Sequence, residues 1–350
     1  MSNGIKIKAL ELCEALLQEQ PTPLTPSTER SSLPPVSEQG WYPVDLRCLD
    51  PEIVTPCDLY RRTGQDRFVL FSQRRLPVDR VVRERLLTHG LNYLYIQEGD
   101  SPVYFDFLKN SLISVVRDPH TSSEKKAQAV HASCQEILRW AFDEPRAPFV
   151  RQAQEAILPT VSLIMTDDSA TRHLIRLTAY DHSTYTHCTN VGIYGVALAK
   201  IFFGSDSMKK METLGPGFFL HDLGKCRIPI EILNKPGALS DSERRIVNKH
   251  PDDGHIMLAE SGLLTEEAKI IALQHHERDD GKGYPNALTG DDIHPYARIC
   301  RLADVYEALT ADRPYHQRKS AFDAFKIMYQ QFTSDLDRKL FELFIQLFAG

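Results

Sequence analysis

Two adjacent histidines, His275 and His276, end a stretch of helical periodicity and are followed by a loop rich in glycine and acidic residues. Neutral imidazole is the commonest metal ligand in proteins, so an adjacent pair constrains the fold strongly. Nine of the thirteen histidines lie between residues 182 and 316, and Asp222 and Asp304 lie in the same part of the chain. A fold that brings this set together would hold metal ions, and mixed His and Asp ligands favour hydrolytic chemistry.

The composition is that of a globular protein without a polyanionic partner. Its 350 residues suffice for two or three domains, and the 42% hydrophobic and 25% charged shares are ordinary. The net charge of −6 is spread along the chain without a basic tract, so duplex nucleic acid is not expected as a partner. A small anionic ligand remains compatible with this balance, because local charge in a pocket matters more than the net value.

The cysteines and the apolar runs predict a soluble cytoplasmic protein. Seven cysteines are scattered without any C-x-x-C pair, which disfavours a disulfide framework or a thiolate zinc site. No apolar run approaches the roughly 20 residues that cross a bilayer. Residues 1–20 also lack a secretory signal, so no interaction with a membrane is expected.

The amino-terminal part is predicted to be a linker followed by a small domain. Residues 1–40 combine a short amphipathic helix over 5–17 with a linker that carries five prolines. Residues 41–107 alternate short apolar runs with turn signals, which predicts a small α/β regulatory domain. Its expected strands are at 68–71 and 93–96, and its expected helix covers 78–88.

Residues 108–178 have a helical pattern throughout and form a predicted helical connector. Apolar residues recur there at three- and four-residue steps. The two stripes are Val130, Cys134, Ile137 and Ala141, then Val150, Ala153, Ile157, Val161 and Ile164. Such stripes are most often core packing; the alternative is a face that pairs with a second chain in a homodimer.

Residues 179–350 show helices and loops without alternating strands, which predicts an all-α bundle. Ser240 and Glu243 form a capping box for a helix that we expect to end at His250, because Pro251 follows. Further helices are expected to begin at Thr265, Ser320 and Ser334. The predicted fold class is therefore multi-domain α+β, with a small N-terminal α/β domain followed by a helical bundle.

Seven residues of this bundle have the character of metal ligands. They are His187, His221, Asp222, His250, His275, His276 and Asp304. Asp222 and Asp304 lie among apolar neighbours, where an unpaired carboxylate is costly to bury and a cation would compensate its charge. A single histidine such as His89 is more often an ordinary surface or core residue, so the inference rests on the whole set.

The number of candidate ligands favours two ions over one. Neighbours on a helix diverge by about 100°, so His275 and His276 can share an ion only at a helix end. If Asp222 bridges two ions, each ion has about four protein ligands. A nitrogen and oxygen set without thiolate suits iron, manganese or zinc and does not decide among them.

The motifs around these residues resemble the HD-GYP family, bacterial phosphodiesterases that hydrolyse cyclic di-GMP and belong to the HD phosphohydrolases. The resemblance covers about residues 179–350, and residues 41–107 look more loosely like a module that often precedes this domain. The motifs are His221-Asp222-x-Gly224-Lys225, His250-Pro251-x-x-Gly254, His275-His276-Glu277-x-x-Asp280-Gly281-x-Gly283-Tyr284-Pro285, Arg301-x-Ala303-Asp304 and Asp312-Arg313-Pro314-Tyr315. Such an ordered set is far more specific than a single His-Asp pair.

The resemblance implies an HD-type bundle with two divalent ions, expected to be iron or manganese. It assigns one ion to His187, His221, Asp222 and Asp304, and the other to Asp222, His250, His275 and His276. Some relatives hold a third ion through a carboxylate one helical turn before the first histidine. That position is Ser183 here, so two metals are expected and not three.

The implied mechanism is an in-line displacement at phosphorus by a hydroxide held between the two ions. Ions about 3.5–4 Å apart can stabilise both the attacking and the leaving oxygen. Asp222 would be catalytic as the bridge. Lys225 would neutralise a phosphate oxygen or aid the leaving group, unless it is a solvated surface lysine. The absence of a G-x-S-x-G pattern agrees with a nucleophile supplied by water.

Four further residues are expected at the substrate. Tyr284 would stack on guanine or serve as a structural aromatic in a tight turn. Arg313 would pair with a phosphate or form a salt bridge at a helix end. Relatives usually carry Asp where Glu307 stands and a basic residue where His316 stands, which puts the preferred dinucleotide in doubt. The GYP loop around Tyr284 would also contact diguanylate cyclase domains of the GGDEF type.

These expectations leave three functions open. The leading one is hydrolysis of cyclic di-GMP to pGpG, with a slow second cut to GMP. The second is a catalytically weak cyclic di-GMP receptor, although a receptor would tolerate loss of ligands that this chain retains. The third is a phosphohydrolase of another cyclic dinucleotide, such as cyclic GMP-AMP. The amino-terminal half is expected to regulate, through a signal that the residues do not identify.

Overall fold

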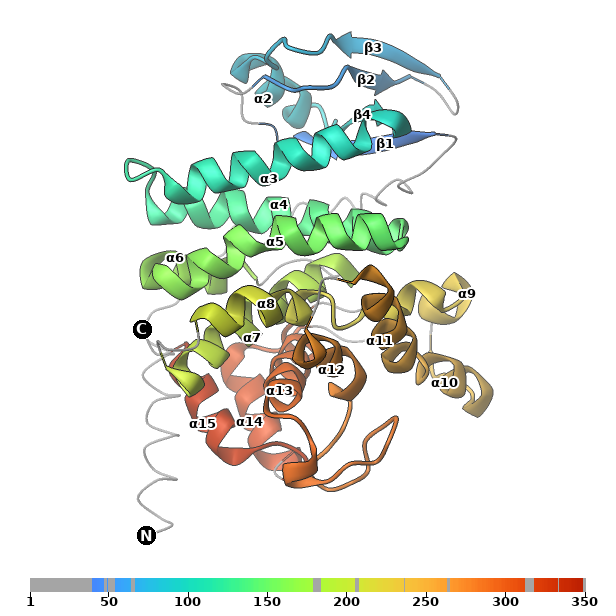
Figure 1. Cartoon of the computed structure of the whole chain (residues 1–350), viewed down its shortest axis with the longest axis vertical. Coiled ribbons are helices and arrows are strands. Elements are labelled where there is room, and N and C mark those ends of the chain that lie inside the picture. Colours follow the sequence, from blue (N-terminus) through green and yellow to red (C-terminus); the bar gives the residue numbers. More distant parts are fainter. Residues whose placement is uncertain are drawn as a thin grey trace.

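The computed structural model arranges the chain in successive layers (Figure 1). A small sheet and one helix, α2 (Arg80–Thr88), lie at one end, the helices between residues 101 and 177 form the middle, and the helices after residue 184 form the other end. The residues that the structure describes are 40–46, 49, 54–63, 67–178, 184–204, 208–235, 237–262, 265–311, 318–332 and 334–348. The helix predicted over 5–17 and the predicted linker lie outside these residues.

The sheet has four antiparallel strands in the order β1-β4-β2-β3. The strands are β1 (Trp41–Asp45), β2 (Leu59–Arg62), β3 (Phe68–Ser72) and β4 (Tyr93–Gln97), and helix α2 covers Arg80–Thr88. The predicted strands at 68–71 and 93–96 are confirmed. The predicted helix starts two residues later than expected, because the Asp79 side chain accepts hydrogen bonds from the backbone N–H groups of Val81 and Val82.

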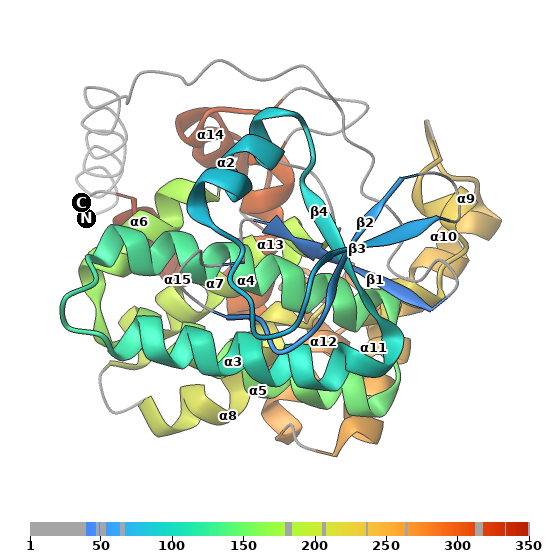
Figure 2. The same cartoon turned by 90° about the horizontal axis from the view of Figure 1, so that it is seen from above.

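The middle of the molecule consists of helices α3 (Ser101–Arg117), α4 (Ser123–Asp143), α5 (Ala147–Thr166) and α6 (Asp168–Leu177). Helix α3 crosses the predicted boundary between residues 107 and 108, because Pro102 lies in its first turn, where a missing N–H costs nothing. Viewed from above, α3, α4 and α5 lie beneath the sheet (Figure 2). The sheet is attached through aromatic packing, with the rings of Tyr42 and Trp140 stacked 4.6 Å apart.

Both apolar stripes predicted for the connector are buried inside the chain. Helix α4 packs against α6 and α7, and helix α5 packs against α8. The stripes therefore form intramolecular core, as the first alternative expected. The predicted homodimer remains a prediction, and it would have to use other faces of these helices.

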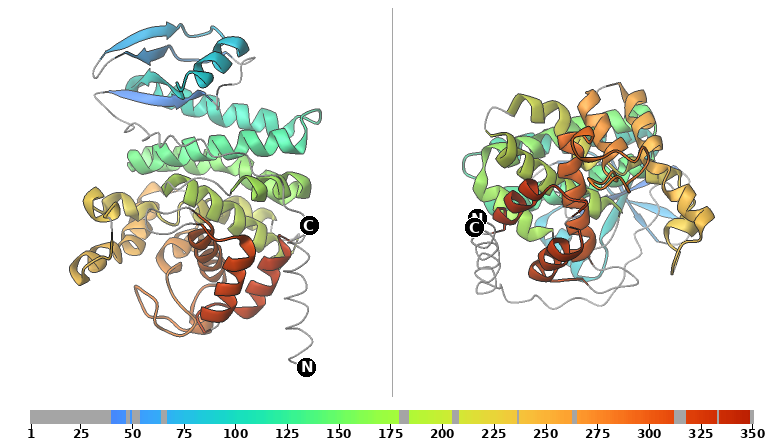
Figure 3. Two further views of the ribbon diagram at one scale, coloured as in Figure 1. Left: turned by 180° about the vertical axis from the view of Figure 1, so that it is seen from behind. Right: turned by 90° about the horizontal axis from the view of Figure 1, so that it is seen from below.

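The described residues of the carboxy-terminal region form helices joined by loops, as expected, and lie at the opposite end from the sheet (Figure 3). Its helices are α7 (Thr184–Phe203), α8 (Met208–Phe219), α9 (Ile230–Leu233), α10 (Asp241–Val247), α11 (His250–Ser261), α12 (Glu266–Gln274), α13 (Pro295–Thr310), α14 (Ala321–Gln331) and α15 (Arg338–Gln346). The predicted caps Ser240, Thr265 and Ser320 are confirmed. No helix in the ranges given above is both long and apolar enough to cross a membrane.

Two predicted helix boundaries in this region are wrong. His250 begins α11 and does not end α10, which stops at Val247, because a proline at position 251 is tolerated in the first turn of a helix. Helix α15 begins at Arg338 and not at Ser334, since Asp337 supplies the N-terminal cap.

Candidate metal centre

Five separate segments bring the seven predicted ligands together. Helix α7 supplies His187, and the loop after α8 supplies His221 and Asp222. His250 lies in the first turn of α11, and His275 and His276 lie at the end of α12. Asp304 comes from α13. All seven lie in the interior or at its edge, although more than 100 residues separate the first from the last.

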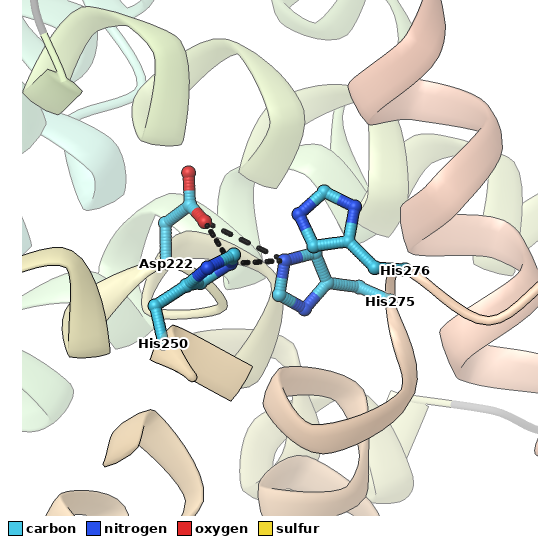
Figure 4. A group of neighbouring side chains, drawn as sticks. All are labelled: Asp222, His250, His275 and His276. Atoms are coloured by element: carbon cyan, nitrogen blue, oxygen red, sulfur yellow. Dashed lines mark hydrogen bonds and ion pairs between the residues drawn. The ribbon is translucent and has the colours of Figure 1, made fainter. Parts of the chain in front are cut away.

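Asp222 and three histidines form one group of converging side chains (Figure 4). The Asp222 Oδ1 atom lies 3.2 Å from His250 Nε2 and 3.4 Å from His275 Nε2. One ligand atom from each of Asp222, His250, His275 and His276 lies within 4.8 Å of the others. We call these four residues the His250 group. His275 and His276 both reach it because they follow the last turn of α12, where the backbone leaves the helix.

The other carboxylate oxygen of Asp222 faces a second group, formed by His187, His221 and Asp304. We call these three residues the His187 group. Asp222 Oδ2 lies 3.3 Å from His187 Nε2 and 3.5 Å from His221 Nε2, and Asp304 Oδ1 lies 3.3 Å from His187 Nε2. Asp222 thus presents one oxygen to each group. The bridging of two ions by Asp222 and the partition of the ligands between them remain predictions.

Most of the imidazoles are oriented by a hydrogen bond at Nδ1. His221, His250 and His275 each place Nδ1 against the backbone carbonyl oxygen three residues earlier, at 2.9, 2.7 and 2.8 Å. The Nδ1 atom of His187 instead lies 2.5 Å from Glu307 Oε2. Because Nδ1 then carries the proton, the lone pair of a neutral ring lies at Nε2, which faces the centre.

The residues present fit a pair of cations. The buried atoms Asp222 Oδ1, His187 Nε2 and His221 Nε2 have no hydrogen-bond partner among the described residues. Buried polar atoms are rarely left without a partner, and divalent cations held by the two groups would satisfy all three. Nitrogen and oxygen donors dominate, which suits iron, manganese or zinc. The thiol of Cys188 also lies near His221 and Asp222, a contact that the sequence reasoning missed.

The pKa of His187 shifts in the opposite direction from the pKa values of the histidines in the His250 group. Burial lowers the pKa of His250, His275 and His276, and the neighbouring imidazoles lower that of His276 further, so these rings stay neutral and able to bind a cation. Burial also opposes protonation of His187, but Glu307 and the two aspartates outweigh it and raise its pKa well above the usual value. A proton and a cation therefore compete for His187.

Both aspartates favour the ionised form despite their burial. Burial opposes ionisation of Asp222, but Lys225 and His221 hold its pKa well below the usual range. His187 has the same effect on Asp304, again against the effect of burial. The Lys225 Nζ atom lies 2.5 Å from Asp222 Oδ2, so this side chain points into the centre and is not a freely solvated surface lysine.

Gly224 allows the loop that carries His221 and Asp222 to lie directly on α11. A Cβ atom at Gly224 would come within 2.0 Å of the His250 carbonyl oxygen and 2.5 Å of the Gly254 nitrogen. Only glycine fits so close a backbone approach. The glycines of two sequence motifs therefore meet in space and fix the distance between Asp222 and His250.

Tyr284 and Glu307, two of the residues expected at the substrate, contact different histidines of the metal centre. The ring of Tyr284 stacks on that of His276, with centroids 4.7 Å apart and planes at 23°, so it lies against the His250 group. Glu307 does not occupy the expected substrate-facing position: it is 2% exposed and contacts His187 from behind. Its helical position three residues after Asp304 directs it toward α7. Arg313, His316 and Ser183 lie outside the described residues.

Glu277 organises the loop that carries Tyr284, a role that the sequence reasoning did not assign. This carboxylate is 1% exposed and accepts hydrogen bonds from the backbone N–H groups of Asn286 at 2.7 Å and Leu288 at 2.9 Å. The signal was present in the sequence, because Glu277 directly follows the paired histidines. Its contacts tie the end of α12 to the GYP loop.

Comparison with known proteins supports the expected HD-type fold of the carboxy-terminal helical bundle. Residues 207–340 match the family model described as an HD domain. Bd1817, a HDG"Y"P protein from Bdellovibrio bacteriovorus, has a similar structure, with a TM-score of 0.68 over 89% of this chain and 100% of that chain. The sequence identity to that structure is 19%, so this similarity concerns the fold alone.

Three relatives of known name share substantial sequence with this chain. The cyclic di-GMP phosphodiesterase PA4108 of Pseudomonas aeruginosa is 35% identical over 52% of this chain and 44% of its own length. The cyclic di-GMP phosphodiesterase response regulator RpfG of Xanthomonas campestris is 29% identical over 82% and 71%, respectively. The 3'3'-cGAMP-specific phosphodiesterase 2 of Vibrio cholerae is 42% identical over 39% and 26%. The chain therefore spans about half or less of two of these relatives. Residues 207–340 are therefore similar to an HD domain, and the expected resemblance to the HD-GYP proteins is confirmed in the fold.

Proposed function

We propose that this protein is a metal-dependent phosphodiesterase that hydrolyses cyclic di-GMP to pGpG and, more slowly, to GMP. The observation that carries the proposal is the position of Asp222, whose two carboxylate oxygens face two different groups of ligands. A shared carboxylate between two imidazole-rich groups is suited to a pair of divalent ions. We expect iron or manganese, held by the His187 group and the His250 group with Asp222 between them.

The cations, when bound, would supply activation of water and neutralisation of phosphate charge. The residues of the chain have separate tasks. Lys225 places an ammonium group at the centre, 2.5 Å from Asp222 Oδ2, where it can also neutralise a phosphate oxygen. Tyr284 covers His276 and offers its ring beside the His250 group as a surface for a guanine base. A water-derived nucleophile fits this set, because the sequence lacks the G-x-S-x-G pattern of a serine nucleophile.

The names of two relatives, PA4108 and RpfG, favour cyclic di-GMP as the substrate. A second candidate is cyclic GMP-AMP, because the Vibrio cholerae enzyme specific for 3'3'-cGAMP is 42% identical over its matched part. The two differ in one base, so the discrimination would depend on contacts to the bases and not on the metal ligands. We also propose that the GYP loop is the surface available to diguanylate cyclase domains.

The test is product identification with protein purified anaerobically and loaded with iron or manganese. We expect two metal ions per chain by elemental analysis and conversion of cyclic di-GMP to pGpG. His250→Ala, which removes one ligand, serves as the inactive control. A folded, two-metal protein that binds cyclic di-GMP tightly without cutting it would establish the receptor function instead. Faster cleavage of cyclic GMP-AMP in competition would establish the second candidate.

A further inference from the structure

Glu307 distinguishes the two halves of the metal centre. Three of the ligand imidazoles place Nδ1 against neutral backbone carbonyl oxygens, and His276 Nδ1 lies 3.9 Å from Asp304 Oδ2. His187 differs from them, because its Nδ1 lies within hydrogen-bond distance of a carboxylate, at 2.5 Å from Glu307 Oε2. The His187 group therefore has Glu307 behind it in addition to its own Asp304. The members of the His250 group are three imidazoles and the shared Asp222.

The position of Glu307 follows from the packing of α7 against α13. Asn190 lies three positions after His187 on α7, and Glu307 lies three positions after Asp304 on α13, so each pair lies on one face of its helix. Glu307 Oε2 contacts His187, and Glu307 Oε1 accepts a hydrogen bond from Asn190 Nδ2 at 3.4 Å. Glu307 is 2% exposed and Asn190 1%, so water does not screen these contacts.

Asn190 connects this pair to the preceding helical layer. Its Nδ2 atom also donates to the carbonyl oxygen of Thr178, at the end of α6, over 3.0 Å. The carboxylate is thus held from two sides, by His187 and by Asn190. A carboxylate that holds a ligand imidazole fixes the tautomer and the orientation of the ring and makes the metal-facing nitrogen more basic.

We propose that Glu307 is a positioning residue that makes the two cation positions unequal, so that the His187 group binds its cation more tightly than the His250 group does. This inference rests on the proposed metal-dependent function. Glu307 holds His187 with Nε2 directed at the centre and adds negative charge behind that half. Its role is therefore at the metal and not at the guanine base or phosphate of the substrate.

The test is a titration of metal-free full-length protein with Mn²⁺, in which free Mn²⁺ is counted by electron paramagnetic resonance. We expect two stepwise dissociation constants in the unaltered protein. Glu307→Ala should weaken the tighter one by about 10- to 100-fold and leave the weaker one unchanged, the range typical for loss of such a partner. Glu307→Gln keeps a hydrogen-bond acceptor and should weaken it less. Glu231→Gln on exposed α9 is the matched control, expected to change neither constant.

Three results would overturn the inference. The first is two unchanged dissociation constants in Glu307→Ala, and the second is an equal loss at both positions. The third is a change in KM for cyclic di-GMP without any change in metal affinity, which would show that Glu307 acts on the substrate and not on the metal. If Glu307→Ala does not fold, the nearly isosteric Glu307→Gln decides. The titration contains no substrate, so unequal cation affinities in a protein that leaves cyclic di-GMP intact would contradict the proposed function and not this inference.

Discussion

Replacement of Gly224 by alanine tests whether the motifs act through their spatial contact. The added Cβ would lie 2.0 Å from the His250 carbonyl oxygen, whereas such contacts essentially never fall below 3.0 Å. The loop and the start of α11 must therefore separate by about 1 Å. That movement lengthens the 3.2 Å separation between Asp222 Oδ1 and His250 Nε2. A 1 Å error in the position of catalytic groups costs about 100-fold in rate.

We expect Gly224→Ala to lose about 100-fold in turnover and to bind the cation of the His250 group more weakly. Overpacking of this kind also costs about 1–3 kcal/mol of stability. The assay combines turnover of cyclic di-GMP, Mn²⁺ titration and thermal unfolding. Gly99→Ala is the control, since a Cβ at Gly99 meets nothing within 4 Å. A folded Gly224→Ala protein with two cations and ordinary turnover would refute the reasoning.

Three further predictions follow from the same structure. Asp222→Ala removes the oxygens facing both groups and should abolish turnover and weaken both cation sites, as measured by elemental analysis; retention of two tightly bound ions would contradict the bridging role. Glu136 is fully buried, and its burial raises its pKa to about 7 from 4.5, so its protonated form stabilises the fold below about pH 4.5 and that contribution is lost as the pH rises to about 7. Glu136→Gln should therefore gain on the order of 3 kcal/mol relative to the unaltered protein between pH 4.5 and 7 in urea unfolding, and a constant difference would show that the carboxyl does not titrate there. Trp140→Ala removes a side chain with no exposed surface that stacks on Tyr42 and should cost about 3–5 kcal/mol of unfolding free energy; a loss below 1 kcal/mol would mean that the sheet is not anchored through this ring.

The set of residues that converge in the candidate metal centre was predictable, because each side chain has a strong local signature. Imidazoles beside apolar residues, and aspartates that would be costly to bury alone, pointed to the same seven positions that converge in the structure. The helix caps at Ser240 and Thr265 were predictable for the same reason, because each cap contacts a residue three positions later in the sequence. The boundary at His250 was misjudged because a proline is compatible with either the end of one helix or the first turn of the next.

The role of Glu307 could not be predicted, because it depends on which neighbouring helix its side chain faces. Sequence spacing places it one turn after Asp304 on α13, but only the packing of α13 against α7 brings it to His187. The contact of Gly224 with α11 and the hold of Glu277 on the GYP loop are also products of packing. The partners of Gly224 and Glu307 are distant in the sequence, and only the partners of Glu277 belong to the same loop.

The sequence by itself determined the chemical groups available to this protein: imidazoles, carboxylates, a lysine near them and an amphipathic helical framework. These properties follow from residue type and local periodicity, which do not depend on how distant segments pack together. Only the tertiary structure decided that each oxygen of Asp222 faces a different group and that Glu307 stands behind His187. Those assignments depend on the direction of side chains at helix contacts, because a shift of one position along a helix turns a side chain toward a different neighbour.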